Sequence, residues 1–361
     1  MVDPLPDRAR KGRGAISNRS GRFEAQARVA VDDGWALPED DDPPPPLATQ
    51  VIADKSRSVI ARNQSPDVPF DRSVNPYRGC EHGCVYCFAR PTHAFLGFSA
   101  GLDFETKIVV KHEVAALLQA ELARPTYKPA PLALGTNTDP YQPLERRLGL
   151  TRQVLQVLAD CRHPLTIVTK SDLVLRDLDI LAPLARQRLA RVMISVTTLD
   201  RRLARLMEPR APTPARRLAA MAALNRAGVP CGVMVAPMIP ALNDGELDRI
   251  LAAGAEAGAT CGGYVLLRLP LEIRDLFVEW LEAHFPDRRD KVMHQLREMR
   301  GGRDYDATFG RRFSGRGVYA ETLAKRFQLA CKRLGLERND WQLDCSLFER
   351  PAADRRQMTL L

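Results

Sequence analysis

Short apolar, β-branched runs alternate along the middle of the chain with segments whose apolar residues recur at helical spacing. This alternation, from about residue 69 to residue 285, is typical of parallel strands joined by helices. Six strand–helix units can be counted. The expected strands are 73–77, 131–135, 165–169, 191–196, 231–236 and 263–269. The expected helices are 111–123, 147–160, 175–181, 214–227, one capped by Asn243 or Asp244, and one through Phe277 and Leu281.

Six such units fit either a partial barrel or an open, doubly wound sheet. In both architectures, ligands gather at the carboxyl ends of the strands. Beyond Phe285 the pattern is only helical, with expected helices over 292–300 and 319–334 separated by a loop, 301–317. We therefore expect an α/β domain over 49–285 and a helical C-terminal extension over 286–361.

The first 48 residues lack this pattern. They mix Arg, Gly, Asp and Pro, and they end in the acidic run 39–42 followed by the four prolines 43–46. Such a segment buries too little apolar surface to repay its ordering entropy. We expect residues 1–48 to form a flexible, disordered arm whose proline end is stiff.

Composition and charge narrow the class of protein. The chain has 361 residues, 45% of them hydrophobic and 27% charged, which excludes collagen-like and wholly disordered proteins. Its 53 basic and 44 acidic side chains give a net charge of +9, which suits a polyanionic partner but also describes solvated, arginine-rich helix faces. Three of the eight cysteines cluster and five are scattered, so we expect reduced thiols and a cytoplasmic protein. No apolar run suits a signal peptide or a membrane span.

The clustered cysteines follow the first expected strand in the sequence VNPYRGCEHGCVYC, with the spacing Cx3Cx2C. Three thiolates can hold three irons of a [4Fe-4S] cluster, and since such clusters normally take four, one iron stays free for another ligand. Glycines beside the cysteines allow the loop to fold tightly. The alternatives are a Cys3His zinc site that uses His82 or His93, and three unligated thiols.

This motif, with an aromatic residue before the last cysteine, resembles that of the radical S-adenosylmethionine (SAM) superfamily. The segment VNPYRGCEHGCVYCFAR, followed later by GTNTDPYQPLE, is similar to sequences of the spore photoproduct lyase-like branch, whose members are often labelled DNA-repair photolyase-like proteins. The resemblance covers about residues 68–285. It implies a partial (β/α)6 TIM-type barrel in which Cys80, Cys84 and Cys87 bind the cluster. It further implies that SAM binds the fourth iron and is cleaved reductively to a 5′-deoxyadenosyl radical, with electrons from a donor such as flavodoxin or ferredoxin.

The resemblance and the strand ends also give candidate cofactor-binding residues. Tyr86 is expected to shield the cluster from water. After the second strand, the family usually has a Gly-Gly-Glu-like stretch that contacts the SAM amino group. This chain departs from that stretch, and its candidates for the same role are Asn137, Asp139 and, further on, Glu145. The alternative is an ordinary Asp-Pro turn. The others are Lys170 for the SAM carboxylate, Ser195 for the carboxylate or ribose, and the backbone around Val235 for adenine.

The substrate is less defined, and no catalytic residue toward it is assigned. The lyases place a hydrogen-donating cysteine near the end of the second strand, but residues 132–137 contain none, which argues against thymine-dimer reversal by that mechanism. Arg268 is a candidate to face substrate. The loop 301–317 mixes Arg, Gly and aromatic residues, which suits nucleic acid or a solvated loop that closes the barrel. The sequence thus predicts a radical SAM enzyme with a substrate that includes nucleic acid among its candidates; the alternative is a non-catalytic, Cys-rich metal-binding module of a nucleic-acid-associated protein.

Overall fold

A computed structural model describes residues 7–24, 26–27, 47–337 and 342–352. Seven strands form one sheet in the order β10-β9-β8-β7-β6-β3-β2. Six are parallel, and β2 (Ile60–Arg62) pairs antiparallel with β3 at one edge. The parallel strands are β3 (Arg72–Val74), β6 (Leu132–Leu134), β7 (Leu165–Thr169), β8 (Ala190–Ser195), β9 (Cys231–Met238) and β10 (Cys261–Leu266). No pairing among the described strands joins β10 to β2, so the sheet is an open, partial barrel, as predicted.

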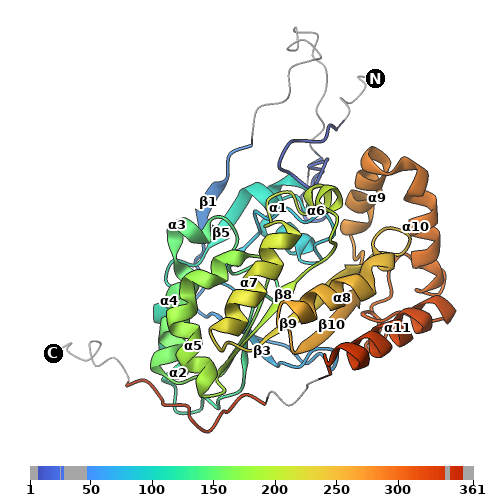
Figure 1. The fold of residues 1–361 in the computed structure, drawn as a ribbon. Helices are drawn as coiled ribbons and strands as arrows, with labels where there is room; N and C mark the ends of the chain where they lie inside the picture. The colour runs from blue at the N-terminus through green and yellow to red at the C-terminus, as the bar shows by residue number, and fades with distance from the viewer. Residues whose placement is uncertain (1–6, 25, 28–46, 338–341, 353–361) are drawn as a thin grey trace.

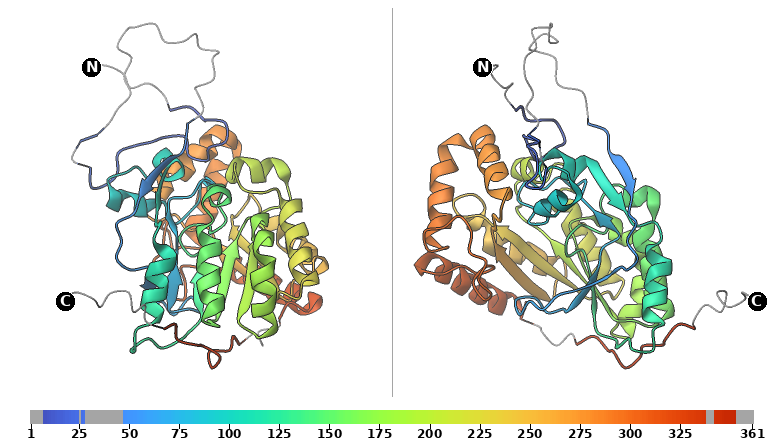
Figure 2. Two further views of the ribbon diagram at one scale, coloured as in Figure 1. Left: turned by 90° about the vertical axis from the view of Figure 1, so that its left-hand side faces the viewer. Right: turned by 180° about the vertical axis from the view of Figure 1, so that it is seen from behind.

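Helices cover the outer face of this sheet (Figures 1 and 2). Alternate strand residues face them, because side chains alternate between the two faces of a strand. A Cβ added to Gly254 of α8 would lie 2.8 Å from Val233 of β9, so helix and strand pack at close range. The covering helices are α2 (Val114–Leu122), α4 (Leu150–Asp160), α5 (Leu178–Arg186), α7 (Pro214–Arg226) and α8 (Leu247–Glu256), with α9 (Ile273–His284) after β10.

The first unit departs from the expected one. The predicted strand 73–77 is interrupted before β4 (Tyr77–Arg78), because Pro76 has no N–H to donate to a ladder. β4 turns to pair with β5 (Lys107–Val110), which also pairs with β1 (Gln50–Ala53) in a second, three-stranded sheet. The helix expected over 111–123 therefore begins only at Val114.

Other boundaries also differ from the sequence-based ones. The helix expected over 175–181 is a 3-10 turn, η2 (Asp172–Asp177), followed by α5. The prediction that Asn243 or Asp244 caps α8 was wrong, because no side chain among the described residues caps this helix. Asn243 instead accepts from the N–H of Ile239 at 2.6 Å and donates to Thr197 O and Pro237 O, which fixes the preceding turn. The sequence did not predict the strands β1, β2 and β5. It also did not predict the helices η1 (Arg90–Leu96), α1 (Leu102–Thr106), α3 (Glu145–Leu148), α6 (Arg201–Met207) and η3 (Asp244–Glu246).

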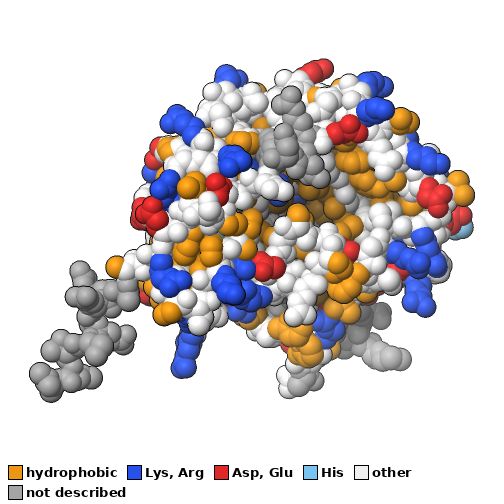
Figure 3. Space-filling model, turned by 90° about the horizontal axis from the view of Figure 1, so that it is seen from below, with side chains coloured by type: hydrophobic (Ala, Val, Ile, Leu, Met, Phe, Trp, Pro, Cys, Tyr) orange, Lys and Arg blue, Asp and Glu red, His pale blue; other side chains and the backbone are white. Residues whose placement is uncertain are grey.

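The C-terminal residues cover one edge and one end of the barrel. Helices α10 (Pro286–Glu298) and α11 (Val318–Leu334) confirm the expected helical pattern, although α10 begins earlier than predicted. The intervening loop, 301–317, follows the free edge of β10, where the N–H of Leu266 donates to Phe313 O at 2.8 Å. Residues 342–352 cross the amino ends of β7 and β8, and the nearby lower face is hollowed and largely lined by hydrophobic side chains (Figures 1 and 3).

The described part of the N-terminal segment lies against the barrel. Ala15 and Ser17 are buried, and the N–H of Leu102 donates to Ser17 O at 3.3 Å. The sequence did not predict this contact. The acidic run and the prolines of the expected arm lie outside the described residues, so the flexibility of that part stays a prediction. Within the described chain, no helix is both long and apolar enough to span a membrane.

Candidate functional site

The cysteine loop, residues 80–87, lies at the carboxyl end of the sheet, directly after β4. The N–H of Cys80 donates to Phe104 O at 3.0 Å, and that of Cys87 donates to Cys84 O at 3.2 Å. Cys80 and Cys84 are buried, Cys87 is half-buried, and all three are free thiols. Gly83 has φ of +68°, and a Cβ there would lie 2.8 Å from a Glu105 oxygen, so the turn requires glycine.

A buried arginine holds this loop in place. Arg90 has no exposed surface, and its guanidinium donates to Cys84 O at 2.8 Å and to Gly83 O at 3.1 Å. It also forms an ion pair with Glu105 at 2.5 Å. Glu105 in turn accepts from the backbone N–H groups of Gly14 at 3.1 Å and Ala15 at 2.8 Å. The N-terminal segment is thus linked to the cysteine loop through two side chains.

The three thiols share an apolar environment. Burial raises the pKa of Cys84 to about 12, and it raises the pKa of Cys80 and Cys87 as well. Negative charge on Cys84 and on Cys87 raises the pKa of Cys80 further. Three adjacent thiolates here need a positively charged centre, because burial and mutual repulsion both oppose ionisation. The loop therefore fits a metal cluster better than three unligated thiolates.

The zinc alternative depends on which side chains could join the three thiols. In the described part of the chain, no three His, Cys, Asp or Glu side chains are placed to hold one metal ion. A zinc site needs ligands that converge on one ion, whereas the thiols that hold a four-iron cluster bind different irons. The two candidate zinc ligands have other contacts: His93 Nε2 lies 2.9 Å from Lys107 O, and His82 Nδ1 lies 3.4 Å from Asp139 Oδ2.

A buried polar network adjoins Tyr86. Its O–H donates to Glu208, which also accepts from Thr197 Oγ1 at 2.6 Å and pairs with Arg217. Burial opposes ionisation of Glu208, but the charges of Arg217 and Lys170 prevail and lower its pKa to about 2. Lys170 Nζ lies 5.8 Å from the centre of the Tyr86 ring. The sequence did not single out Glu208 or Arg217, because neither belongs to a motif.

Asp139 joins two strand ends to the cysteine loop. Its Oδ1 accepts from Thr169 Oγ1 at 2.6 Å and its Oδ2 from the N–H of Lys170 at 2.7 Å. Burial opposes its ionisation, but these bonds and the nearby His82 lower its pKa to about 2. Asp139 is therefore largely engaged within the protein.

The other two candidates for the SAM amino group differ in exposure. Asn137 is exposed, and its N–H donates to Asn75 Oδ1 at 3.2 Å. Glu145 is fully buried, pairs with Arg176 at 2.7 Å, and accepts from the Tyr77 O–H and the N–H of Thr151. Of the three candidates after β6, Asn137 is the one whose side chain is open to a ligand.

The remaining predicted cofactor contacts lie on or after three neighbouring strands, β7, β8 and β9. Lys170 follows β7, Ser195 ends β8, and Ser195 is paired with Met234 in β9. Val235 lies within β9 and is fully buried in the core, so its side chain is not open to a ligand. These three residues thus lie on adjacent strands of the sheet or just after them, and their contacts with SAM stay a prediction.

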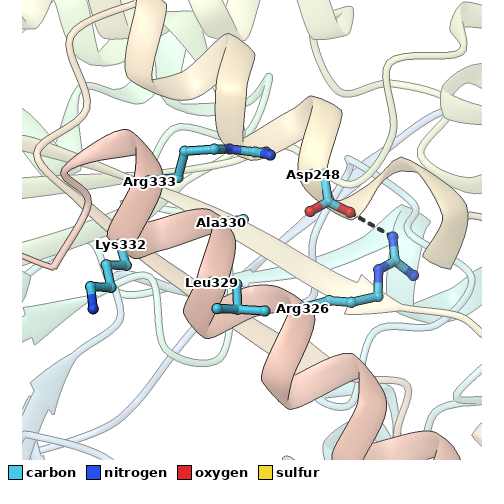
Figure 4. A pocket seen from close by; sticks show the side chains of 6 residues that line it. All are labelled: Asp248, Arg326, Leu329, Ala330, Lys332 and Arg333. Atoms are coloured by element: carbon cyan, nitrogen blue, oxygen red, sulfur yellow. Dashed lines mark hydrogen bonds and ion pairs between the residues drawn. The ribbon is translucent and has the colours of Figure 1, made fainter.

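A separate surface pocket of about 660 Å³ lies between α8 and α11 (Figure 4). Arg326 reaches across it to Asp248 at 2.7 Å. Its lining includes no residue of the cysteine loop or of the strand ends, so it is distinct from the candidate site. The lining residues are Asp248, Arg326, Leu329, Ala330, Lys332 and Arg333.

Comparisons with known proteins show the family of this chain. Residues 74–253 match the family model of the radical SAM superfamily. An uncharacterised protein of Mycobacterium tuberculosis is 46% identical over 232 residues, which cover 63% of this chain and 68% of the relative. An uncharacterised protein of Methanocaldococcus jannaschii is 26% identical over 238 residues, or 66% of this chain and 85% of the relative.

Two solved structures have the same fold. Spore photoproduct lyase complexed with dinucleoside spore photoproduct gives a TM-score of 0.53 at 18% identity, over 79% of both chains. A mutant of that lyase with bound AdoMet and dinucleoside spore photoproduct gives 0.54 at 18% identity, over 79% of this chain and 78% of the other. The residues that match the family model run from the end of β3 through the cysteine loop to α8, and the chain therefore belongs to the radical SAM superfamily.

Proposed function

We propose that this protein is an enzyme that cleaves SAM reductively, with a [4Fe-4S] cluster held by Cys80, Cys84 and Cys87. The observation that carries the proposal is the cysteine loop itself: three free thiols in one turn, at the carboxyl end of the sheet. When bound, the cluster supplies the electron that breaks SAM into methionine and a 5′-deoxyadenosyl radical, which takes a hydrogen atom from the substrate.

The chain's own residues bind and orient SAM in this proposal. Lys170 is a cation, because the charges of Cys84 and Glu208 outweigh the burial that lowers its pKa, and the net shift is upward. It pairs with the SAM carboxylate, while Ser195 and the backbone at Val235 supply hydrogen bonds. Asn137 contacts the amino group. Tyr86, only 7% exposed, keeps water from one side of the cluster.

Anaerobic reconstitution with iron and sulfide tests this function. The protein is then reduced with dithionite in the presence of SAM, and 5′-deoxyadenosine is measured by chromatography. We expect 5′-deoxyadenosine from the wild type and from Cys231→Ala, a buried thiol outside the loop, but not from Cys84→Ala. Binding of zinc alone, without iron and sulfide, would instead favour the non-catalytic metal-binding module.

Nucleic acid is the substrate class that we propose. Its support is the net charge of +9, the exposed aromatic rings of Phe88 and Phe309, and the dinucleoside spore photoproduct bound by a protein of the same fold. Because residues 132–137 contain no cysteine, hydrogen donation from that position is not proposed. Binding of single-stranded DNA or RNA that weakens steeply with salt is the expected result. Binding that is independent of salt contradicts it.

The setting of the reaction is also a proposal. All eight cysteines are free, which suits a reducing compartment, and we propose the cytoplasm. The electron donor is then a soluble one-electron carrier such as flavodoxin or ferredoxin. Reduction of the reconstituted protein by either carrier, in place of dithionite, should also yield 5′-deoxyadenosine. Failure with both carriers points to another donor.

A further inference from the structure

An arginine at the end of the last strand reaches the cysteine loop. Arg268 lies two residues after β10, and its guanidinium carbon is 5.1 Å from the centre of the Phe88 ring. Phe88 directly follows Cys87 and is 44% exposed. The same guanidinium carbon is 4.8 Å from the centre of the Phe313 ring, in the C-terminal loop. The guanidinium therefore contacts two aromatic rings, one of which belongs to the residue after the proposed cluster ligand Cys87.

The charge of Arg268 has no carboxylate partner in the part of the chain that the structure describes. Its one hydrogen bond is from Nη2 to the Tyr305 hydroxyl at 3.2 Å, and its Nε is buried without a partner. Stacking between rings leaves the N–H edge of a guanidinium free to donate to two oxygens in its own plane. Arg268 therefore presents donors and a positive charge that the described chain does not satisfy.

A second arginine increases the positive charge at this place. Arg300 is 1% exposed and donates to two backbone carbonyls, Leu267 O and Arg311 O, each at 2.9 Å. Burial, and then the charge of Arg268, lower the pKa of Arg300 to about 10, so it remains a cation near neutral pH. The closest acidic influence comes from Asp306, which forms no ion pair with Arg300 in the described structure.

Other arginines in the protein have carboxylate partners, unlike Arg268 and Arg300. Arg90 pairs with Glu105, and Arg217 pairs with Glu208. The neighbouring, half-buried Arg312, which lies near the rings of Phe309 and Phe313, pairs with Asp67 at 2.5 Å. Since leaving a buried charge unpaired is costly, the buried Arg300 and the half-buried Arg268, which have no carboxylate partner in the described chain, favour an anion supplied from outside.

We propose that Arg268, with Arg300 behind it, binds an oxyanion of the substrate, a phosphate or a carboxylate, and holds it over Phe88 beside the cluster. This inference rests on the proposed function and names one chemical group of the substrate. A phosphate source is a nucleotide, and a carboxylate source is an amino-acid derivative. Either is bound by the same in-plane donors.

Ligand-observed NMR titration of the reconstituted protein, without SAM, tests the site. Two matched pairs of probes are used: thymidine monophosphate with thymidine, and N-acetylphenylalanine with its amide. We expect the charged member of at least one pair to bind about 10-fold or more tightly than its neutral counterpart, as a charge-assisted bond requires. The pair that shows the difference identifies the source of the oxyanion.

Two variants assign the effect to Arg268. In Arg268→Gln the preference for the charged probe should disappear, whereas in Arg326→Gln, which alters a partly exposed arginine of the α8–α11 pocket, it should persist. If Arg268→Gln does not fold, Arg268→Lys keeps the charge and should retain only part of the preference, since it loses the planar fork. Equal binding of charged and neutral probes by the wild type, or an unchanged preference in the Arg268 variants, overturns the inference. Because SAM is absent, failure of SAM cleavage does not affect this test.

Discussion

Arg90 and Glu105 form a fully buried ion pair at 2.5 Å that joins the cysteine loop to α1 and to the N-terminal segment. Besides Glu105, Arg90 donates to Ala100 O at 3.1 Å and Gly101 O at 2.9 Å, so its donors face several carbonyls at once. A planar guanidinium can satisfy so many acceptors, and a lysine cannot. The pair fixes the loop backbone before any cofactor binds.

We expect Arg90→Met to destabilise the protein by about 3–5 kcal/mol, because it leaves the Glu105 charge buried and unpaired. The double variant Arg90→Met/Glu105→Leu should be more stable than Arg90→Met, since neither charge remains. Urea unfolding followed by circular dichroism measures the stability of both variants. The iron bound per chain after reconstitution should decrease with the stability. Arg289→Met is the control, since Arg289 is an exposed arginine paired with Asp290 at 2.7 Å. A loss in Arg90→Met no larger than in this control contradicts the role of the pair.

Gly14 lies close enough to the cysteine loop that no side chain fits there. A Cβ at this position would lie 1.9 Å from the carbonyl oxygen of Gly83. Gly14→Ala should therefore destabilise the protein by about 1–3 kcal/mol and release the N-terminal segment to trypsin. Gly245→Ala, where a Cβ would meet nothing within 4 Å, should change stability by less than about 0.5 kcal/mol. Equal melting temperatures for the two variants would show that the close approach does not matter.

Lys170 should contribute to SAM affinity through its charge. We expect Lys170→Met to weaken SAM binding by about 10-fold to 100-fold, the usual effect of losing one charge-assisted hydrogen bond. Equilibrium dialysis of the reconstituted protein measures the dissociation constant. Lys332→Met, on the α8–α11 pocket, should leave it unchanged. If both variants bind SAM like the wild type, then another residue holds the carboxylate.

His163 should make stability depend on pH. It is fully buried, its Nε2 lies 2.7 Å from the Tyr127 hydroxyl, and burial lowers its pKa from 6.5 to about 4. His163 therefore binds a proton below pH 6.5 in the unfolded chain, but only below about pH 4 in the folded chain. The free energy of unfolding should decrease as the pH is lowered from 6.5 to 4. Between pH 7.5 and 5.5 we expect a loss of about 1.4 kcal/mol from this residue.

Comparison with His163→Gln isolates that contribution, because other groups titrate equally in both proteins. The free energy of unfolding in urea, measured at several pH values, should fall less steeply below pH 6.5 in the variant. Parallel curves for the two proteins would mean that His163 is as easily protonated in the folded chain as in the unfolded one.

The sequence by itself determined the features that depend on neighbouring residues. Alternating apolar runs predicted the six parallel strands, and the Cx3Cx2C spacing predicted the cysteine loop, because strand periodicity and a short loop involve only residues close along the chain. It failed where a single proline or a distant partner decided the outcome. The strand expected over 73–77 is broken, and Asn243 contacts residues of the preceding turn instead of capping a helix.

Only the tertiary structure decided which distant residues surround that loop. Gly14 and Glu105 are 91 positions apart, and Arg268 and Phe88 lie on opposite ends of the barrel domain's sequence, yet each pair is in contact. Such contacts leave no periodic pattern in the sequence, because they arise when the curved sheet brings distant segments together and not from local spacing. The spacing of three cysteines thus predicts the chemistry, while the packing of the whole barrel decides which side chains hold the loop and which are left to meet the substrate.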